Sequence, residues 1–83
     1  MKSKEEIERK IRLLLEIGNN EDRFSEGKRA GQKNALRWAM SNPESRIANR
    51  LSHLRTTMGN YHGIFNEGVV QGQIEILEWV LEK

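Results

Sequence analysis

Two histidines and a group of basic residues are the side chains in this chain whose types could support chemistry. His53 and His62 are nine residues apart, and no pair of carboxylates flanks them, so they do not form a general acid–base pattern. Cysteine is absent, which removes disulfides and thiolate ligands for zinc. The sequence therefore predicts no catalytic residues, no metal and no cofactor. A hydrolase of unknown type centred on the two histidines is the alternative.

Basic residues gather in the middle of the chain. Between residues 28 and 62 there are seven lysines and arginines and a single acid, Glu44, whereas both flanking stretches are net negative. At intervals of four residues, basic side chains line one side of a helix. We expect them to form a partner-binding patch, whose members are Arg29, Lys33, Arg37, Arg46, Arg50 and Arg55.

Such a patch has three interpretations. It can bind an acidic protein surface, it can bind the phosphate backbone of a nucleic acid, or it can be a solvated face neutralised by neighbouring carboxylates. The near-neutral net charge of +2 and the expected lack of exposed aromatic residues that could stack on bases argue against nucleic acid. We therefore expect a small protein-binding module of unknown target, and a nucleic-acid-associated protein using the basic 28–55 region is the alternative.

Helical periodicity accounts for nearly the whole chain. Apolar residues such as Ile7, Ile11 and Leu14 recur at helical spacing, with charged residues around the rest of the circumference. The helices are predicted over about residues 3–17, 20–41 and 43–57, and from a break at 56–60 to the C-terminus.

Local signals mark the ends of these helices. Ser3 and Glu6 form a capping box. Asn42 before Pro43 predicts the cap of the third helix, and Asn60 is expected to cap the fourth.

The second half of the chain repeats the first at an offset of 41 residues. Residues 24–38 and 65–79 share seven identities in fifteen positions. If a gap of one residue is allowed, residues 7–14 also align with residues 47–54. We therefore predict an all-α single domain, 1–83, built from a duplicated helical hairpin that forms a pseudo-two-fold four-helix bundle. The two repeats cover about residues 3–41 and 43–82.

Glycines inside the predicted helices need a compensating role, because each costs about 1 kcal/mol relative to alanine. Small residues four apart let another backbone approach closely, so the second and fourth helices are predicted to cross there. A groove for an external ligand is the alternative. The helix-packing motif consists of Gly27, Gly31, Trp38, Gly68, Gly72 and Trp79. Whichever tryptophan is left uncovered would suit a homodimer interface.

Membrane insertion is not expected. No apolar run approaches the roughly 18 residues that span a bilayer, and the N-terminus has no hydrophobic signal core. We expect a water-soluble, cytoplasmic protein.

The ending Glu67-Gly-x-x-x-Gly-Gln-x-Glu-Ile-Leu-Glu-Trp-Val-Leu81 resembles the C-terminal helix of small uncharacterised helical proteins of bacteria and their phages. The resemblance covers about fifteen residues of each repeat. It implies a bacterial or phage setting and a role in protein interaction, such as a phage- or prophage-type regulator or inhibitor. It does not indicate the target.

Overall fold

The computed structural model describes residues 1–16, 22–60 and 62–82, apart from the side chains of residues 15, 16 and 58. These residues form only helices and their connections, which confirms the all-α fold class. The elements are α1 (Lys4–Glu16), α2 (Arg23–Met40), α3 (Glu44–Thr57), the 3₁₀ helix η1 (Met58–Asn60) and α4 (Ile64–Leu81). The predicted break after the third helix is the 3₁₀ helix.

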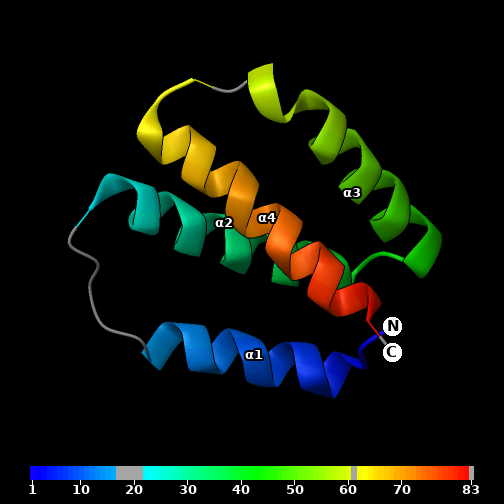
Figure 1. Cartoon of the computed structure of the whole chain (residues 1–83). Helices are drawn as coiled ribbons and strands as arrows, with labels where there is room; N and C mark the ends of the chain where they lie inside the picture. The colour runs from blue at the N-terminus through cyan, green and yellow to red at the C-terminus, as the bar shows by residue number, and fades with distance from the viewer. Residues whose placement is uncertain (17–21, 61, 83) are drawn as a thin grey trace.

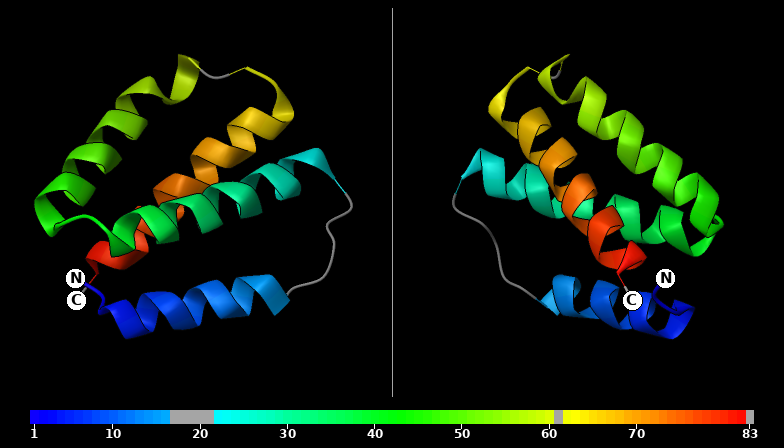
Figure 2. Two further views of the ribbon diagram at one scale, coloured as in Figure 1. Left: turned by 180° about the vertical axis from the view of Figure 1, so that it is seen from behind. Right: turned by 45° about the vertical axis from the view of Figure 1, so that its right-hand side comes forward.

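Helices α2 and α4 form a crossed central pair (Figure 1). They share the most extensive interface in the described part of the chain, and both run in the same direction. Helix α1 packs antiparallel on α2, and α3 packs on α4. The two flanking helices lie on opposite sides of the central pair (Figure 2). The bundle is therefore flat, with extents of 31 × 31 × 18 Å.

The central helices touch backbone to backbone at four buried glycines, Gly27, Gly31, Gly68 and Gly72. A Cβ atom added at any of them would collide with a carbonyl oxygen of the other helix. The glycine hydrogen in that position therefore points at the oxygen, which is the arrangement of a Cα–H···O contact between helices. The predicted crossing at the glycines is confirmed. A groove for an external ligand at this seam was the wrong alternative, because the opposing backbone fills the space.

The contacts at this crossing are reciprocal. The glycines and the carbonyl groups they face are Gly27 with Phe65, Gly68 with Phe24, Gly31 with Val69, and Gly72 with Lys28. Each pair maps onto another by the 41-residue offset seen in the sequence. A pseudo-two-fold axis therefore relates α2 to α4 at the crossing. The duplication of a whole hairpin stays a prediction.

The beginning and end of the described chain meet. The backbone N–H of Lys2, just before α1, donates to the carbonyl of Val80 at 2.7 Å. The N–H of Asn42, just before α3, donates to the carbonyl of Ala39 at 3.3 Å. Helix α1 therefore starts at the end of α4 much as α3 starts at the end of α2.

The hydrophobic core lies between the central pair and the two flanking helices. It includes Ile7 and Leu14 of α1 together with residues of the other three helices, namely Ala35, Leu36, Ala39, Ile47, Leu51, Leu54, Val70, Ile74, Ile76, Leu77 and Val80. Trp38 and Trp79 pack against this core and are only partly buried. Each tryptophan therefore has an edge available for other contacts.

The helix ends agree with the predictions in part. The Ser3–Glu6 capping box forms, since the N–H of Glu6 donates to Ser3 Oγ at 3.2 Å. Helix α2 begins after Asp22, whose carboxylate accepts from the N–H of Ser25 at 2.8 Å. The predicted start of this helix near Asn20 lies outside the described residues.

Two predicted caps were wrong. The side chain of Asn42 donates to the carbonyl of Trp38 at 2.7 Å, so it closes the end of α2 instead of starting α3. Asn60 lies in η1, and the cap of α4 is Gly63, which has a φ of 93° and no side-chain hydrogen bond to offer. For Asn42 the cause is that an asparagine near a helix boundary can bond to either neighbouring element. For Asn60 the cause is its position, because it lies in η1 and α4 begins only after Gly63.

Candidate functional site

The six predicted patch residues differ in their surroundings. Arg29 and Lys33 are half-buried on α2, whereas Arg37, Arg46, Arg50 and Arg55 are exposed. Arg55 is already paired, because its Nη2 lies 2.9 Å from Glu78 Oε2 on α4. Its charge is partly neutralised within the fold, so Arg55 contributes little to a partner-binding surface.

Four cations of the basic region have no acidic partner in the described part of the chain. They are Lys33 and Arg37 on α2, and Arg46 and Arg50 on α3. Lys28, at the start of the same region, is paired with Glu75 at 3.0 Å. The uncompensated charge of the basic region therefore lies on the two helices joined by residues 41–43.

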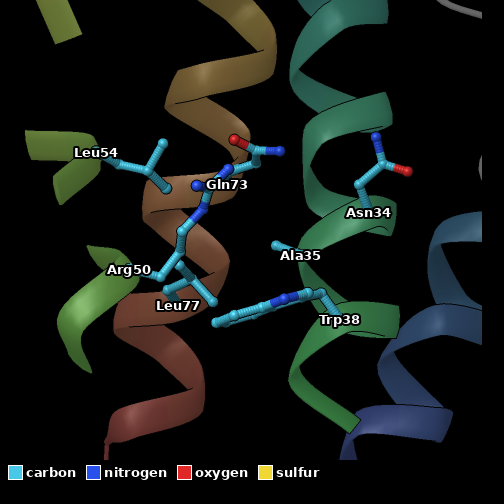
Figure 3. Close-up of a pocket in the computed structure, with 7 residues that line it drawn as sticks. All are labelled: Asn34, Ala35, Trp38, Arg50, Leu54, Gln73 and Leu77. Atoms are coloured by element: carbon cyan, nitrogen blue, oxygen red, sulfur yellow. The ribbon is translucent and has the colours of Figure 1, made fainter. Parts of the chain in front are cut away.

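A groove of about 310 Å³, lined by one of these cations, Arg50, opens between α2, α3 and α4. We call it the Trp38 groove. Its lining residues are Asn34, Ala35, Trp38, Arg50, Leu54, Gln73 and Leu77 (Figure 3). The indole of Trp38 extends from α2 toward Leu77 and Arg50, and the Arg50 side chain rises from α3 toward Gln73.

Helical spacing explains why these side chains meet. Each of the three helices contributes one pair of residues four apart, and such pairs lie on the same side of a helix. The pairs are Asn34 and Trp38 on α2, Arg50 and Leu54 on α3, and Gln73 and Leu77 on α4. The groove therefore combines an apolar floor with one cation, two amides and an indole ring.

The second tryptophan, Trp79, has different surroundings from Trp38. Trp79 borders a groove of about 250 Å³ against α1, lined by Glu6, Arg9, Lys10 and Leu13. The ammonium groups of Lys2 and Lys10 each lie 5.3 Å from the centre of its ring, within the range of cation–π attraction. Trp79 therefore already has intramolecular cationic partners.

A further groove, of about 400 Å³, lies near the N-terminal ends of α2 and α4. It is lined by Phe24, Glu67, Val70 and Gln71. Phe24 is 38% exposed, and Ile64 at the start of α4 is 61% exposed. Among the described residues that line this groove there is one amide, on Gln71, and no cation.

The histidines do not form a catalytic arrangement in the part of the chain that the structure describes. Both are exposed. The backbone carbonyl of His53 accepts hydrogen bonds from the hydroxyl groups of Thr56 and Thr57, each at 2.9 Å, but among the described residues no acid is bonded to either imidazole ring. No three potential metal-ligating side chains come together among the described residues.

One carboxyl group has a clearly displaced pKa. The N–H and the hydroxyl of Ser25 donate to Asp22, which lowers the pKa of that carboxyl below its usual value. Asp22 caps the start of α2, about 18 Å along the helix axis from Asn34 of the Trp38 groove. The lowered pKa therefore bears on the stability of the fold and not on chemistry at the groove.

Sequence reasoning identified part of the Trp38 groove. Trp38 and Arg50 were predicted, but as members of two separate sets, a packing motif and a basic patch. Asn34, Gln73 and Leu77 were not assigned to a site. The only available signal was that each stands four residues from another lining residue, and that spacing is common to every helix.

No family model matches the chain, and the comparisons with curated proteins and with solved structures gave no match. Among the helices of the described residues, none is long and apolar enough to cross a membrane. The inference of function therefore rests on the physical chemistry of the Trp38 groove and of the unpaired cations around it.

Proposed function

We propose that this protein is a small protein-binding module whose partner docks in the Trp38 groove. The observation that carries the proposal is a partly buried indole lining an open groove beside Arg50, an exposed arginine with no acidic partner in the described part of the chain. Tryptophan and arginine are the residues most enriched among those that dominate binding energy at protein interfaces.

The lining of the groove supports a protein ligand. Leu54, Leu77 and Ala35 supply an apolar floor, and the amides of Asn34 and Gln73 can pair with the polar groups of a peptide backbone. From the resemblance expected for the last helix, we further propose that the protein belongs to a bacterial or phage setting and acts as a regulator or inhibitor of a cytoplasmic protein.

Affinity capture with matched variants tests this proposal. Wild-type protein, Arg50→Glu and Arg55→Glu are immobilised and incubated with lysate of the source cell, and retained proteins are identified by mass spectrometry. Arg55 is the control because it is an arginine of the same helix that is already paired with Glu78. We expect a partner that wild type and Arg55→Glu retain and Arg50→Glu loses. Retention of the same proteins by all three would contradict docking at the groove.

Nucleic-acid binding is the second candidate, favoured by the unpaired cations Lys33, Arg37 and Arg46, with Arg29 and Arg50 as its further predicted contacts. A titration against duplex DNA at about 50 mM and about 200 mM salt separates it from the first, because phosphate contacts weaken steeply with salt. Salt-sensitive binding that falls when these residues are replaced would favour it. No binding at the lower salt concentration would exclude it.

A second copy of this chain is the third occupant to test. Docking of one copy on another would leave Trp38 buried in a homodimer. Light scattering across a concentration series distinguishes the mass of a monomer from that of a dimer, and Arg50→Glu should shift the equilibrium if the groove forms the interface.

A further inference from the structure

We infer that the Trp38 groove accepts an acidic segment of a partner protein in which one large apolar side chain is flanked by aspartate or glutamate residues. This inference rests on the proposed function and specifies the chemistry of the partner. It follows from the separation of apolar and charged groups within and around the groove.

The apolar part of the ligand follows from the floor of the groove. Ala35, Leu54 and Leu77 are buried, and the partly buried indole of Trp38 stands beside them. A volume of about 310 Å³ holds a leucine- or phenylalanine-sized side chain with part of the backbone that carries it. Burying one such side chain contributes about 1.5–3 kcal/mol, which is less than the free energy of even a millimolar complex, so the charged residues beside the anchor must supply the rest.

The acidic part follows from the rim of the groove. On α2, Arg37 lies three residues after Asn34, which lines the groove. Residues three apart are neighbours on a helix surface, so we place Arg37 at the α2 edge. On α3, Arg46 lies one turn before Arg50 on the same side. Arg37, Arg46 and Arg50 are exposed and have no acidic partner among the described residues. An arginine can receive a carboxylate through two parallel hydrogen bonds.

Several cations along the rim favour an internal acidic segment over a free chain end. A terminal carboxylate would satisfy one guanidinium and leave the others unpaired. Carboxylates on both sides of an apolar anchor can pair with Arg50 inside the groove and with Arg37 and Arg46 at its edges. The paired cations Lys28 and Arg55 mark where this surface stops, because the carboxylates of α4 already neutralise them.

The test uses the full chain and dye-labelled synthetic peptides of about ten residues, blocked at both ends. The reference peptide has one leucine between glutamates. In a second peptide glutamines replace the glutamates, and in a third alanine replaces the leucine. Binding is measured by fluorescence anisotropy, with duplex DNA as a competitor. We expect the reference peptide to bind with a Kd between about 100 μM and about 1 mM, and each altered peptide to bind about tenfold more weakly or not at all.

Protein variants identify the surface that binds. Arg50→Glu should weaken the reference peptide by about tenfold or more, and Arg55→Glu should stay within about twofold of wild type. In a further peptide, a lysine replaces the glutamate that pairs with Arg50. This peptide should bind to the Arg50→Glu variant more tightly than it binds to the wild-type protein. This reversal cannot arise from misfolding, and circular dichroism checks that each variant keeps its helices.

Three results would overturn the inference. The glutamine peptide could bind as tightly as the reference, Arg50→Glu could bind like wild type, or DNA could displace the peptide and bind more tightly than it does. If no peptide binds while lysate capture yields a partner that depends on Arg50, the acidic segment is wrong and protein binding at the groove stands. If capture also depends on no groove residue, the proposed function fails as well.

Discussion

The carbonyl oxygen of Val69 occupies the space that a Cβ atom on Gly31 would need. On the other side of the crossing, the carbonyl oxygen of Lys28 likewise occupies the space that a Cβ atom on Gly72 would need. Because the obstructing atoms belong to the backbone of a helix, they cannot swing away as a flexible side chain would. The distance between α2 and α4, and with it the position of Trp38 above the groove, therefore depends on glycine at these places.

Gly31→Ala and Gly72→Ala should each destabilise the fold strongly. The added methyl group forces the two central helices apart, and overpacking of this kind costs about 1–3 kcal/mol or more, a large share of the stability of a small domain. Urea denaturation followed by circular dichroism measures the loss. Gly59→Ala is the control, because a Cβ at Gly59 meets nothing within 4 Å. Wild-type stability in Gly31→Ala would show that the helices are not held at this distance.

Gly63→Ala tests the backbone at the start of α4. Gly63 has a φ of 93°, and it is the only residue with positive φ in the described part of the chain. An L-residue in such a conformation is strained by about 1–3 kcal/mol. We expect a loss of stability of that order in thermal or urea unfolding, although the neighbouring side chains leave room for the methyl group. A loss no greater than that of Gly59→Ala would contradict the strain argument.

Because Asp22 caps α2, the stability of the protein should depend on pH. Hydrogen bonds from Ser25 lower the pKa of Asp22 in the folded state. The contribution of Asp22 to the free energy of unfolding is therefore fully present above the unfolded-state pKa of about 3.9. It is lost as the pH falls through the lower pKa of the folded state. The melting temperature of wild type should exceed that of Asp22→Ala most at neutral pH, and the difference should shrink in acid. Asp22→Asn, which keeps a capping side chain without the titration, is the comparison. A difference that does not change with pH would contradict this assignment.

Two ion pairs join α4 to its neighbours and should differ in strength. Arg55 and Glu78 are close, at 2.9 Å, but about half exposed, with side chains 54% and 47% accessible. A double-mutant cycle should give a coupling of about 0.5 kcal/mol that falls with added salt. For Lys28 and Glu75 the coupling should be larger and less sensitive to salt.

The reason lies in the burial of one oxygen. Glu75 Oε1 is shielded from solvent and has no aligned hydrogen bond, so its contact with Lys28 Nζ at 3.0 Å is mainly ionic. Removing the lysine leaves that oxygen without a partner, which costs more than exposing the carboxylate of Glu78. Equal couplings for the two pairs would show that Glu75 is better solvated than its position indicates.

The local structure of this protein, and one of its tertiary contacts, could be predicted from the residues alone. Apolar spacing in residues such as Ile7 and Leu14 predicted the helices, because a side chain returns to the same helix face every three to four residues whatever lies opposite. The glycines at 27, 31, 68 and 72 predicted the crossing, because their cost inside helices requires close backbone packing to offset it. Which neighbour Asn42 would bond was not determined, since both helix ends lie within its reach.

The location of the candidate site depends on how the helices pack, and it could not be predicted from the sequence. Arg55 and Arg50 are equivalent in sequence as exposed arginines of one helix, yet α4 places Glu78 beside the first and Gln73 near the second. In the same way, the ammonium groups of Lys2 and Lys10 lie against the ring of Trp79, whereas in the described part of the chain no cation lies over the ring of Trp38. These differences depend on which residues of other helices come close. The packing of all four helices together sets these distances, so they cannot be predicted from the spacing of residues within any one helix.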